Sequence, residues 1–137
     1  MPEPRDGIAS LATEMARHGI DRDAPVRSVM ALLGDRWTTL ILLVLETGEW
    51  RHAELKRVLA TLSAEQAISQ RVLTLKLRAL ERDGFVARFV THDVPPKVSY
   101  RLTGLGLALQ GQARQTIEWI KANGAAIEAA RVHFDGL

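Results

Sequence analysis

The chain holds 137 residues, which suits one domain of the usual size of roughly 100–200 residues. Its 47% apolar and 25% charged residues are typical of a globular protein and argue against disorder. It has no cysteine, so disulfides, thiol nucleophiles, thiol redox sensing and thiolate metal sites are excluded. The longest apolar run, Leu40–Leu45, is far shorter than the roughly 20 residues that span a bilayer, and no signal-peptide pattern precedes it. We therefore expect a soluble, cytoplasmic protein without a membrane partner.

The first half of the chain is dominated by helical periodicity. Apolar residues recur at helical spacing over Ile8–His18 and again over Pro25–Gly34. Arg36–Thr47 is apolar on nearly every side, which predicts a helix that runs through the core. After an interruption at residues 48–51, His52–Leu59 predicts a fourth helix, and Ala60–Ala67 predicts a polar connection.

The second half adds a capped helix and a hairpin. Ser69 suits the N-cap of a helix that runs to about Asp83, where Gly84 supplies the stop. Phe85–Thr91 and Val98–Leu102 are rich in strand-forming residues. Because the two prolines between these runs cannot join a hydrogen-bonded ladder, we expect that segment to be the tip of a hairpin.

The element order predicts a mainly α fold with a small β-hairpin, arranged as a winged helix-turn-helix. Gly104–Asn123 predicts a long final helix, and Ala125–His133 a short extension of it. We expect an N-terminal arm at residues 1–22, a winged-helix domain at 24–103 and a C-terminal dimerisation helix with a tail at 104–137.

The positive charge is concentrated in one stretch. The formal net charge is only +2, yet residues 69–101 hold 7 Lys and Arg against 3 Asp and Glu. A localised basic segment is typical of a surface that meets phosphate, although short windows also become basic by chance.

The helix predicted from Ser69 carries an apolar face and, opposite it, a polar one. Arginine, hydroxyl and amide side chains on such a face can contact bases in the major groove and phosphates beside it. The candidates for DNA contact on this helix are Ser69, Gln70, Arg71, Thr74 and Arg78. The hairpin adds Arg88, Lys97 and Arg101 as candidates for contact with the adjacent backbone or minor groove. The alternatives are a solvated charged face and an ordinary surface hairpin.

Four short segments form a specific pattern in this order and spacing. The first segment holds APV and LGDRW within residues 24–37, and the second is RHAEL at residues 51–55. The third holds the pairs IS, LT, LR and LE within residues 68–81 and ends at DG, residues 83–84. The fourth is VPPKVSYRLT at residues 94–103, followed by Gly106. Through them the chain resembles the HxlR-type regulators, a bacterial winged-helix group related to the MarR-like dimers, over about residues 24–120. The resemblance implies a DNA-binding dimer whose recognition helix is Ser69–Asp83 and whose wing is Arg88–Arg101.

The chain departs from this family's usual pattern at three places. Ala24 stands where many members carry a sensing cysteine, so thiol-based sensing is excluded. Ala60–Ala67 is longer than the usual turn before the recognition helix, which we expect to alter the spacing to DNA. Ser99 replaces a commonly acidic residue, which removes a negative charge from the wing.

Two further surfaces follow from apolar residues. The face of the final helix is wide enough for a partner helix, and its predicted dimer-interface residues are Leu105, Leu109, Ala113, Ile117 and Ile120. A small-molecule effector pocket is the second hypothesis, lined by Met30, Trp37, Trp50 and Trp119. For both sets the alternative is an ordinary place in the core.

The sequence contains no motif for metal binding, phosphate binding or catalysis. The four histidines, His18, His52, His92 and His133, lack the spacing of metal ligands, and no nucleophile elbow, phosphate-binding loop or paired carboxylates are present. We therefore expect no metal, no cofactor and no enzymatic activity. The function predicted is a homodimeric, sequence-specific regulator that binds an inverted repeat in double-stranded DNA. We expect it to act as a repressor, with activation as the open alternative, and to respond to an effector, if at all, without thiol chemistry. The alternative is a winged-helix module for protein–protein contact.

Overall fold

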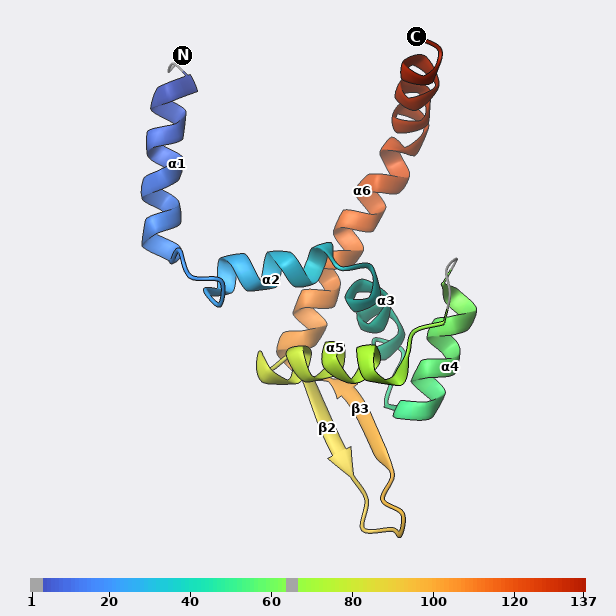
Figure 1. Cartoon of the computed structure of the whole chain (residues 1–137). Helices are drawn as coiled ribbons and strands as arrows, with labels where there is room; N and C mark the ends of the chain where they lie inside the picture. Colours follow the sequence, from blue (N-terminus) through green and yellow to red (C-terminus); the bar gives the residue numbers. More distant parts are fainter. Residues whose placement is uncertain (1–3, 64–66) are drawn as a thin grey trace. The chain divides into compact units, whose positions relative to one another are not determined.

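The computed structural model of the protein describes residues 4–63 and 67–137 (Figure 1). The chain divides into two units, residues 1–38 and 39–137, and each is described by itself. The helix α3, Arg36–Leu45, begins in the first unit and continues into the second.

The first unit holds two helices before α3. They are α1, Pro4–His18, and α2, Pro25–Gly34. Asp35 ends α2 and also caps α3, because its Oδ2 accepts hydrogen bonds from the backbone N–H of Thr38 at 2.9 Å and from the Thr38 hydroxyl at 2.8 Å. The sequence predicts both helices, but α1 begins four residues before Ile8, where polar residues show no apolar periodicity.

The second unit is a winged helix-turn-helix followed by one long helix. After α3 come β1, Trp50–Arg51, α4, His52–Leu62, and α5, Gln70–Arg82. The wing follows as β2, Val86–Val90, and β3, Val98–Leu102, and α6, Gly104–Asp135, ends the chain. The strands form one antiparallel sheet in the order β1-β3-β2. The predicted fold class, mainly α with a small β-hairpin, is confirmed.

The sequence patterns miss one short strand, and two predicted element boundaries are wrong. Residues 50–51 form β1, which no local pattern marks because its ladder partners are Tyr100 and Ser99. The helix α4 continues to Leu62, so the predicted connection from Ala60 is partly helical, and residues 64–66 lie outside the described residues. The helix α6 runs unbroken through Gly124, because a glycine costs an interior helix position only about 1 kcal/mol and no proline accompanies it.

Leucine and isoleucine side chains from four helices fill the core of the second unit. Members of α3, α4 and α5 are fully buried, and α6 and the strands close the core on its other sides. The buried apolar side chains are Ile41, Leu42, Val44, Leu45, Leu55, Leu59, Ile68, Leu73, Leu77, Leu80, Phe85, Val86, Tyr100, Leu109 and Ala113. This core leaves the wing free to extend beyond it (Figure 1).

Hydrogen bonds join the start of α6 to the turn that connects α5 with the wing. The Thr103 hydroxyl donates to the carbonyl of Gly84 at 2.6 Å and accepts from the Gly106 N–H at 3.0 Å. The Thr103 N–H also donates to the carbonyl of Phe85 at 3.0 Å. A Cβ on Gly106 would lie 1.9 Å from the Phe85 carbonyl oxygen, so only glycine fits there.

Replacement of Gly106 by alanine should therefore lower the free energy of unfolding by more than about 1–3 kcal/mol, the usual cost of overpacking, because the obstacle is backbone. The matched control is Gly111→Ala on the same helix, where an added Cβ meets nothing within 4 Å. That change should stabilise the protein by about 0.5–1 kcal/mol. Urea unfolding at equal protein concentration measures both, and equal midpoints for the two variants would contradict this account of the junction.

Candidate DNA interface

The helix α5 is the element on which the candidate interface depends. Its N-terminus is capped by Ser69, whose Oγ accepts a hydrogen bond from the Val72 N–H at 3.1 Å. Its C-terminus ends at Asp83, and Gly84 then adopts a φ of +82°, a conformation that favours glycine. Both ends lie where the sequence predicts them, so the register of the helix is defined from both sides.

The two faces of α5 differ sharply in burial. Leu73, Leu77 and Leu80 are fully buried, which leaves the opposite face outward. Gln70, Arg71 and Arg78 on that face are exposed and Thr74 is half-buried, while Ser69 is exposed at the cap. All five predicted contact residues of this helix are therefore accessible to some degree.

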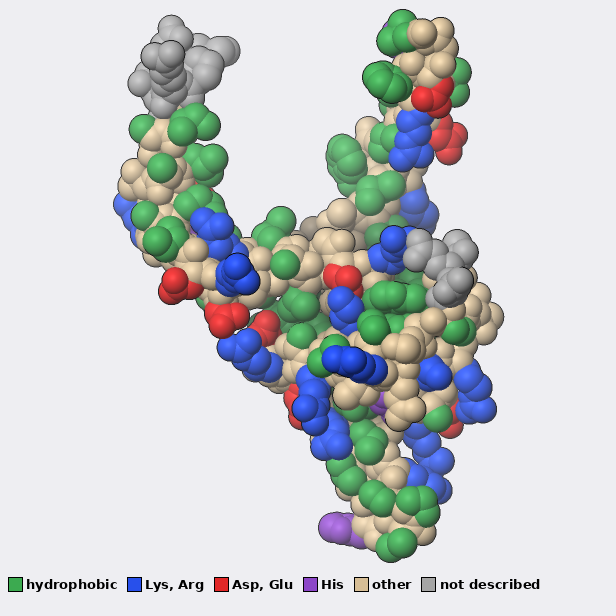
Figure 2. Space-filling model, viewed as in Figure 1, with side chains coloured by type: hydrophobic (Ala, Val, Ile, Leu, Met, Phe, Trp, Pro, Cys, Tyr) green, Lys and Arg blue, Asp and Glu red, His purple; other side chains and the backbone are tan. Residues whose placement is uncertain are grey.

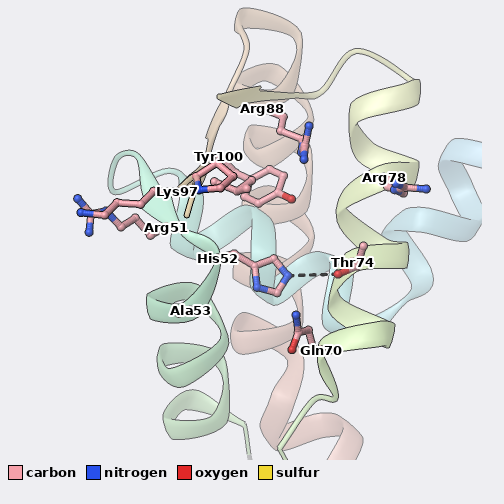
Figure 3. A pocket seen from close by; sticks show the side chains of 11 residues that line it. Arg51, His52, Ala53, Gln70, Thr74, Arg78, Arg88, Lys97 and Tyr100 are labelled. Carbon is pink, nitrogen blue, oxygen red and sulfur yellow. Dashed lines mark hydrogen bonds between the residues drawn. The ribbon is translucent and has the colours of Figure 1, made fainter. Parts of the chain in front are cut away.

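A concave surface lies between α5, the wing and the start of α4 (Figure 3). We call it the cationic hollow; it has a volume of about 500 Å³. Its charged and polar lining residues are Arg51, His52, Gln70, Thr74, Arg78, Arg88, Lys97 and Tyr100. No carboxylate belongs to the described lining, so the hollow is suited to an anion. Figure 2 shows Lys and Arg side chains gathered over α5 and the adjoining part of the wing.

Arg51 and His52 line the cationic hollow but are absent from the sequence-based candidates, as is Tyr100 of β3. Arg51 is brought there by β1, in which it pairs with Ser99 of β3. His52 follows it as the first residue of α4. The sequence shows both within the RHAEL segment, but their place beside α5 depends on a strand pairing across some fifty residues of chain, which local patterns do not reveal.

The three basic residues predicted for the wing do not all lie on the same face of the sheet. Arg88 lies opposite Tyr100 in the ladder, and both line the cationic hollow together with Lys97. Arg101 lies opposite Ala87, so its side chain projects from the other face of the sheet. There its guanidinium stacks 4.7 Å from the centroid of the Phe89 ring, a cation–π contact.

His52 connects α4, α5 and the sheet. Its Nε2 forms a hydrogen bond of 3.3 Å with the hydroxyl of Thr74, and its ring centroid lies 6.2 Å from that of Tyr100 (Figure 3). Burial lowers the pKa of His52 below its usual value of 6.5, and the positive charge of Lys56 lowers it further. Both effects favour the neutral form of the ring in the free protein.

The residues predicted for a dimer interface divide along α6. Leu109 and Ala113 are buried in the chain's own core, and Ile117 is half-buried. Leu105 and Ile120 are exposed. The same helix therefore buries Leu109 and Ala113 in its own domain and presents the apolar side chains of Leu105 and Ile120 outward, and the interface itself stays a prediction.

The residues predicted for an effector pocket are distributed over both units. Met30 and Trp37 belong to the first unit, in which Met30 is exposed. In the second unit Trp50 lines an apolar hollow of about 350 Å³ with side chains of α3 and α4, whereas Trp119 on α6 is 63% exposed. The effector pocket stays a prediction.

Within residues 4–63 and 67–137, no group of three or more His, Cys, Asp or Glu side chains could hold a metal ion. In the same ranges no single helix is long and apolar enough to cross a membrane, and one bent pair, α2 with α3, meets that test by length and composition alone.

Comparison with known proteins places this geometry in a family. The family described as HxlR-like helix-turn-helix matches residues 32–128. The uncharacterized HTH-type transcriptional regulator YybR of Bacillus subtilis (strain 168) is 37% identical over 107 residues, covering 78% of this chain and 81% of YybR. YtfH of Escherichia coli (strain K12), described in the same words, is 35% identical over 107 residues, covering 78% of this chain and 80% of YtfH.

Solved structures agree with the sequence relatives. The transcriptional regulator ytfH from Salmonella typhimurium superimposes with a TM-score of 0.67 at 33% identity, covering 81% of this chain and 94% of ytfH. The redox regulator HypR in its reduced form gives a TM-score of 0.65 at 37% identity, covering 77% of this chain and 98% of HypR. The expectation that the chain is not an enzyme is confirmed, because its relatives are transcriptional regulators. The chain belongs to the HxlR-like helix-turn-helix family of transcriptional regulators.

Proposed function

We propose that the protein is a homodimeric repressor that binds an inverted repeat in double-stranded DNA, with α5 in the major groove and the wing on the adjacent backbone. The observation that carries the proposal is the exposed polar face of α5 beside a cationic hollow without a carboxylate in its described lining. DNA phosphates favour such a concentration of cations, whereas a protein-contact surface would do so only with an acidic partner.

In this proposal, base contacts and phosphate contacts come from different elements. Arg71 and Arg78 project from α5, where an arginine fork can bind guanine O6 and N7, and Gln70 and Thr74 offer amide and hydroxyl groups. Arg88 and Lys97 approach from the wing side of the hollow, where a backbone phosphate fits. Arg101 is directed away from the hollow, so we assign it to packing on Phe89 instead.

The second half of α6 supports dimerisation. Ile117, Ile120, Gly124 and Ile127 follow Ala113 at alternating spacings of four and three residues, which is the seam pattern of paired helices. Ile120 is 47% exposed although it continues the face that is buried at Ala113. A second copy of α6 would cover this seam. Binding to successive major grooves then requires the two α5 helices to lie about 34–36 Å apart, one turn of DNA.

In this proposal the operator lies within a promoter. A dimer bound there represses transcription because it blocks access of RNA polymerase to the promoter. The redox control named for HypR has no thiol equivalent here, since the chain has no cysteine. An effector would have to act through other groups, and the apolar hollow at Trp50 is our candidate for its site.

The proposal is tested by fluorescence anisotropy with the DNA upstream of the protein's own gene, with scrambled DNA as reference and salt as the variable. We expect a specific Kd of about 10⁻⁸–10⁻¹¹ M that weakens steeply with salt. Arg78→Ala should weaken specific binding by about 5–150-fold, the equivalent of a lost base contact of ~1–3 kcal/mol.

The matched control for Arg78→Ala is Arg131→Ala, which removes the same charge from an exposed site near the end of α6. It should leave the preference for specific over scrambled DNA unchanged. If both variants lose affinity equally, or if Arg78→Ala retains full specific affinity, the assignment of the base-contacting face is wrong.

Dimerisation is tested by Ile120→Glu, which places a charge in the predicted seam. We expect monomers by light scattering after size exclusion, because burying an unpaired carboxylate is costly, together with a large loss of DNA affinity. Gln115→Glu adds the same charge at an exposed position on the opposite face of α6 and should remain dimeric. A dimeric Ile120→Glu variant would contradict the proposed interface.

A further inference from the structure

The hydrogen bond between His52 and Thr74 joins the first turn of α4 to the outward face of α5. Thr74 is one of the residues proposed to contact DNA, and its hydroxyl has a single hydrogen and two lone pairs. The 3.3 Å bond to His52 Nε2 therefore occupies part of what Thr74 can offer to DNA. Which part it occupies depends on which of the two atoms is the donor.

The two directions of this bond have opposite consequences. If Nε2 is unprotonated, it accepts the hydroxyl hydrogen, and Thr74 presents only lone pairs, which suit donors such as cytosine N4–H or adenine N6–H. If Nε2 carries a hydrogen, it donates to Thr74, whose hydroxyl hydrogen is then free for a phosphate oxygen or a base acceptor. The imidazole thus determines the polarity of a group on the DNA-facing helix.

We infer that His52 is a positioning residue for DNA recognition: it holds Thr74 at the edge of the cationic hollow and sets whether that hydroxyl meets DNA as a donor or only as an acceptor. The inference rests on the proposed function, because it assigns a role within the same interface. His52 need not touch a base itself, since its ring lies between Thr74 and Tyr100.

The surroundings of His52 make its protonation depend on DNA. Lys56 on α4 is the charged group that acts on His52 in the free protein, and Tyr100 of β3 lies beside its ring. Arg51, Arg78, Arg88 and Lys97 line the same hollow, and Arg51 and Lys97 also line an adjoining one with Glu49 and Glu54. No carboxylate belongs to the described lining of the cationic hollow. In the free protein burial and Lys56 lower the pKa of His52, which favours the neutral form of the ring.

DNA reverses this balance by bringing phosphates into the hollow, and the pKa of His52 rises in the complex because the negative charge favours imidazolium. A group with a higher pKa in the bound state takes up a proton on binding, so affinity increases as the pH falls through that range. Imidazolium carries hydrogens on both nitrogens and can only donate, so Thr74 then meets DNA as a donor.

The test combines a measurement without DNA and one with it. In the free protein, ¹H–¹⁵N NMR of the imidazoles follows the Nε2 signal and the titration of His52 in the wild type and in Thr74→Val. We expect the loss of the hydroxyl to shift both the Nε2 signal and the titration midpoint. Unchanged values in Thr74→Val would overturn the link between the two residues, whatever the protein does with DNA.

With DNA, the specific Kd is measured between pH 5.5 and pH 8 for the wild type, His52→Phe and His52→Gln. His52→Phe keeps a ring beside Tyr100, and His52→Gln keeps a hydrogen-bonding group if the phenylalanine variant does not fold. Wild-type affinity should rise toward low pH by up to roughly tenfold for each unit that DNA raises the pKa. Both variants should show a flatter profile. His133→Gln, at an exposed position on α6, is the matched control, and its specific Kd should depend on pH as that of the wild type does.

The outcomes separate the two proposals. A wild-type pH profile retained in His52→Gln would overturn the role of His52 while leaving DNA binding intact. Absence of specific DNA binding by the wild type at every pH and salt concentration would overturn the proposed function and, with it, the DNA-facing role of Thr74. In that case the NMR comparison would still decide whether His52 holds the Thr74 hydroxyl.

Discussion

The burial of three leucines on one side of α5 is the constraint on which the candidate interface depends. Leu73, Leu77 and Leu80 are fully covered by the core, so rotation of α5 about its axis would expose apolar surface to water. The opposite face must then carry Arg71 and Arg78 outward. The Ser69 cap and the turn at Gly84 stop the helix from sliding along its axis. Packing, rather than any contact among the polar residues, fixes the orientation of the side chains proposed to contact DNA.

The wing is oriented by the same part of the molecule. The chain passes from α5 to β2 through Gly84, and Thr103 joins this turn to the start of α6 by hydrogen bonds to Gly84 and Gly106. Because Gly106 permits contact with the Phe85 backbone, α6, α5 and the sheet meet at one point. The position of Arg88 relative to Arg78 is therefore set by rigid elements, as a preorganised binding surface requires.

Local patterns were sufficient to predict α5 and the wing but not the complete site. Leucines at helical spacing between a capping serine and a glycine specify α5, and paired prolines mark the hairpin tip. The two-residue strand β1 has no signal of its own, since it exists only through its pairing with Tyr100 and Ser99. Without β1, neither Arg51 nor His52 can be placed in the cationic hollow. Burial of Leu109 likewise depends on which half of α6 meets the core, which its apolar periodicity does not distinguish.

The central claim, that two copies of α5 enter successive major grooves, is tested most directly by selection from a pool of randomised DNA duplexes followed by sequencing. The account predicts enrichment of an inverted repeat whose half-sites are centred about one helical turn apart, near 34–36 Å. Enrichment of a single half-site would contradict the dimer geometry. Absence of any enriched sequence, even at low salt, would contradict the claim that α5 contacts bases at all.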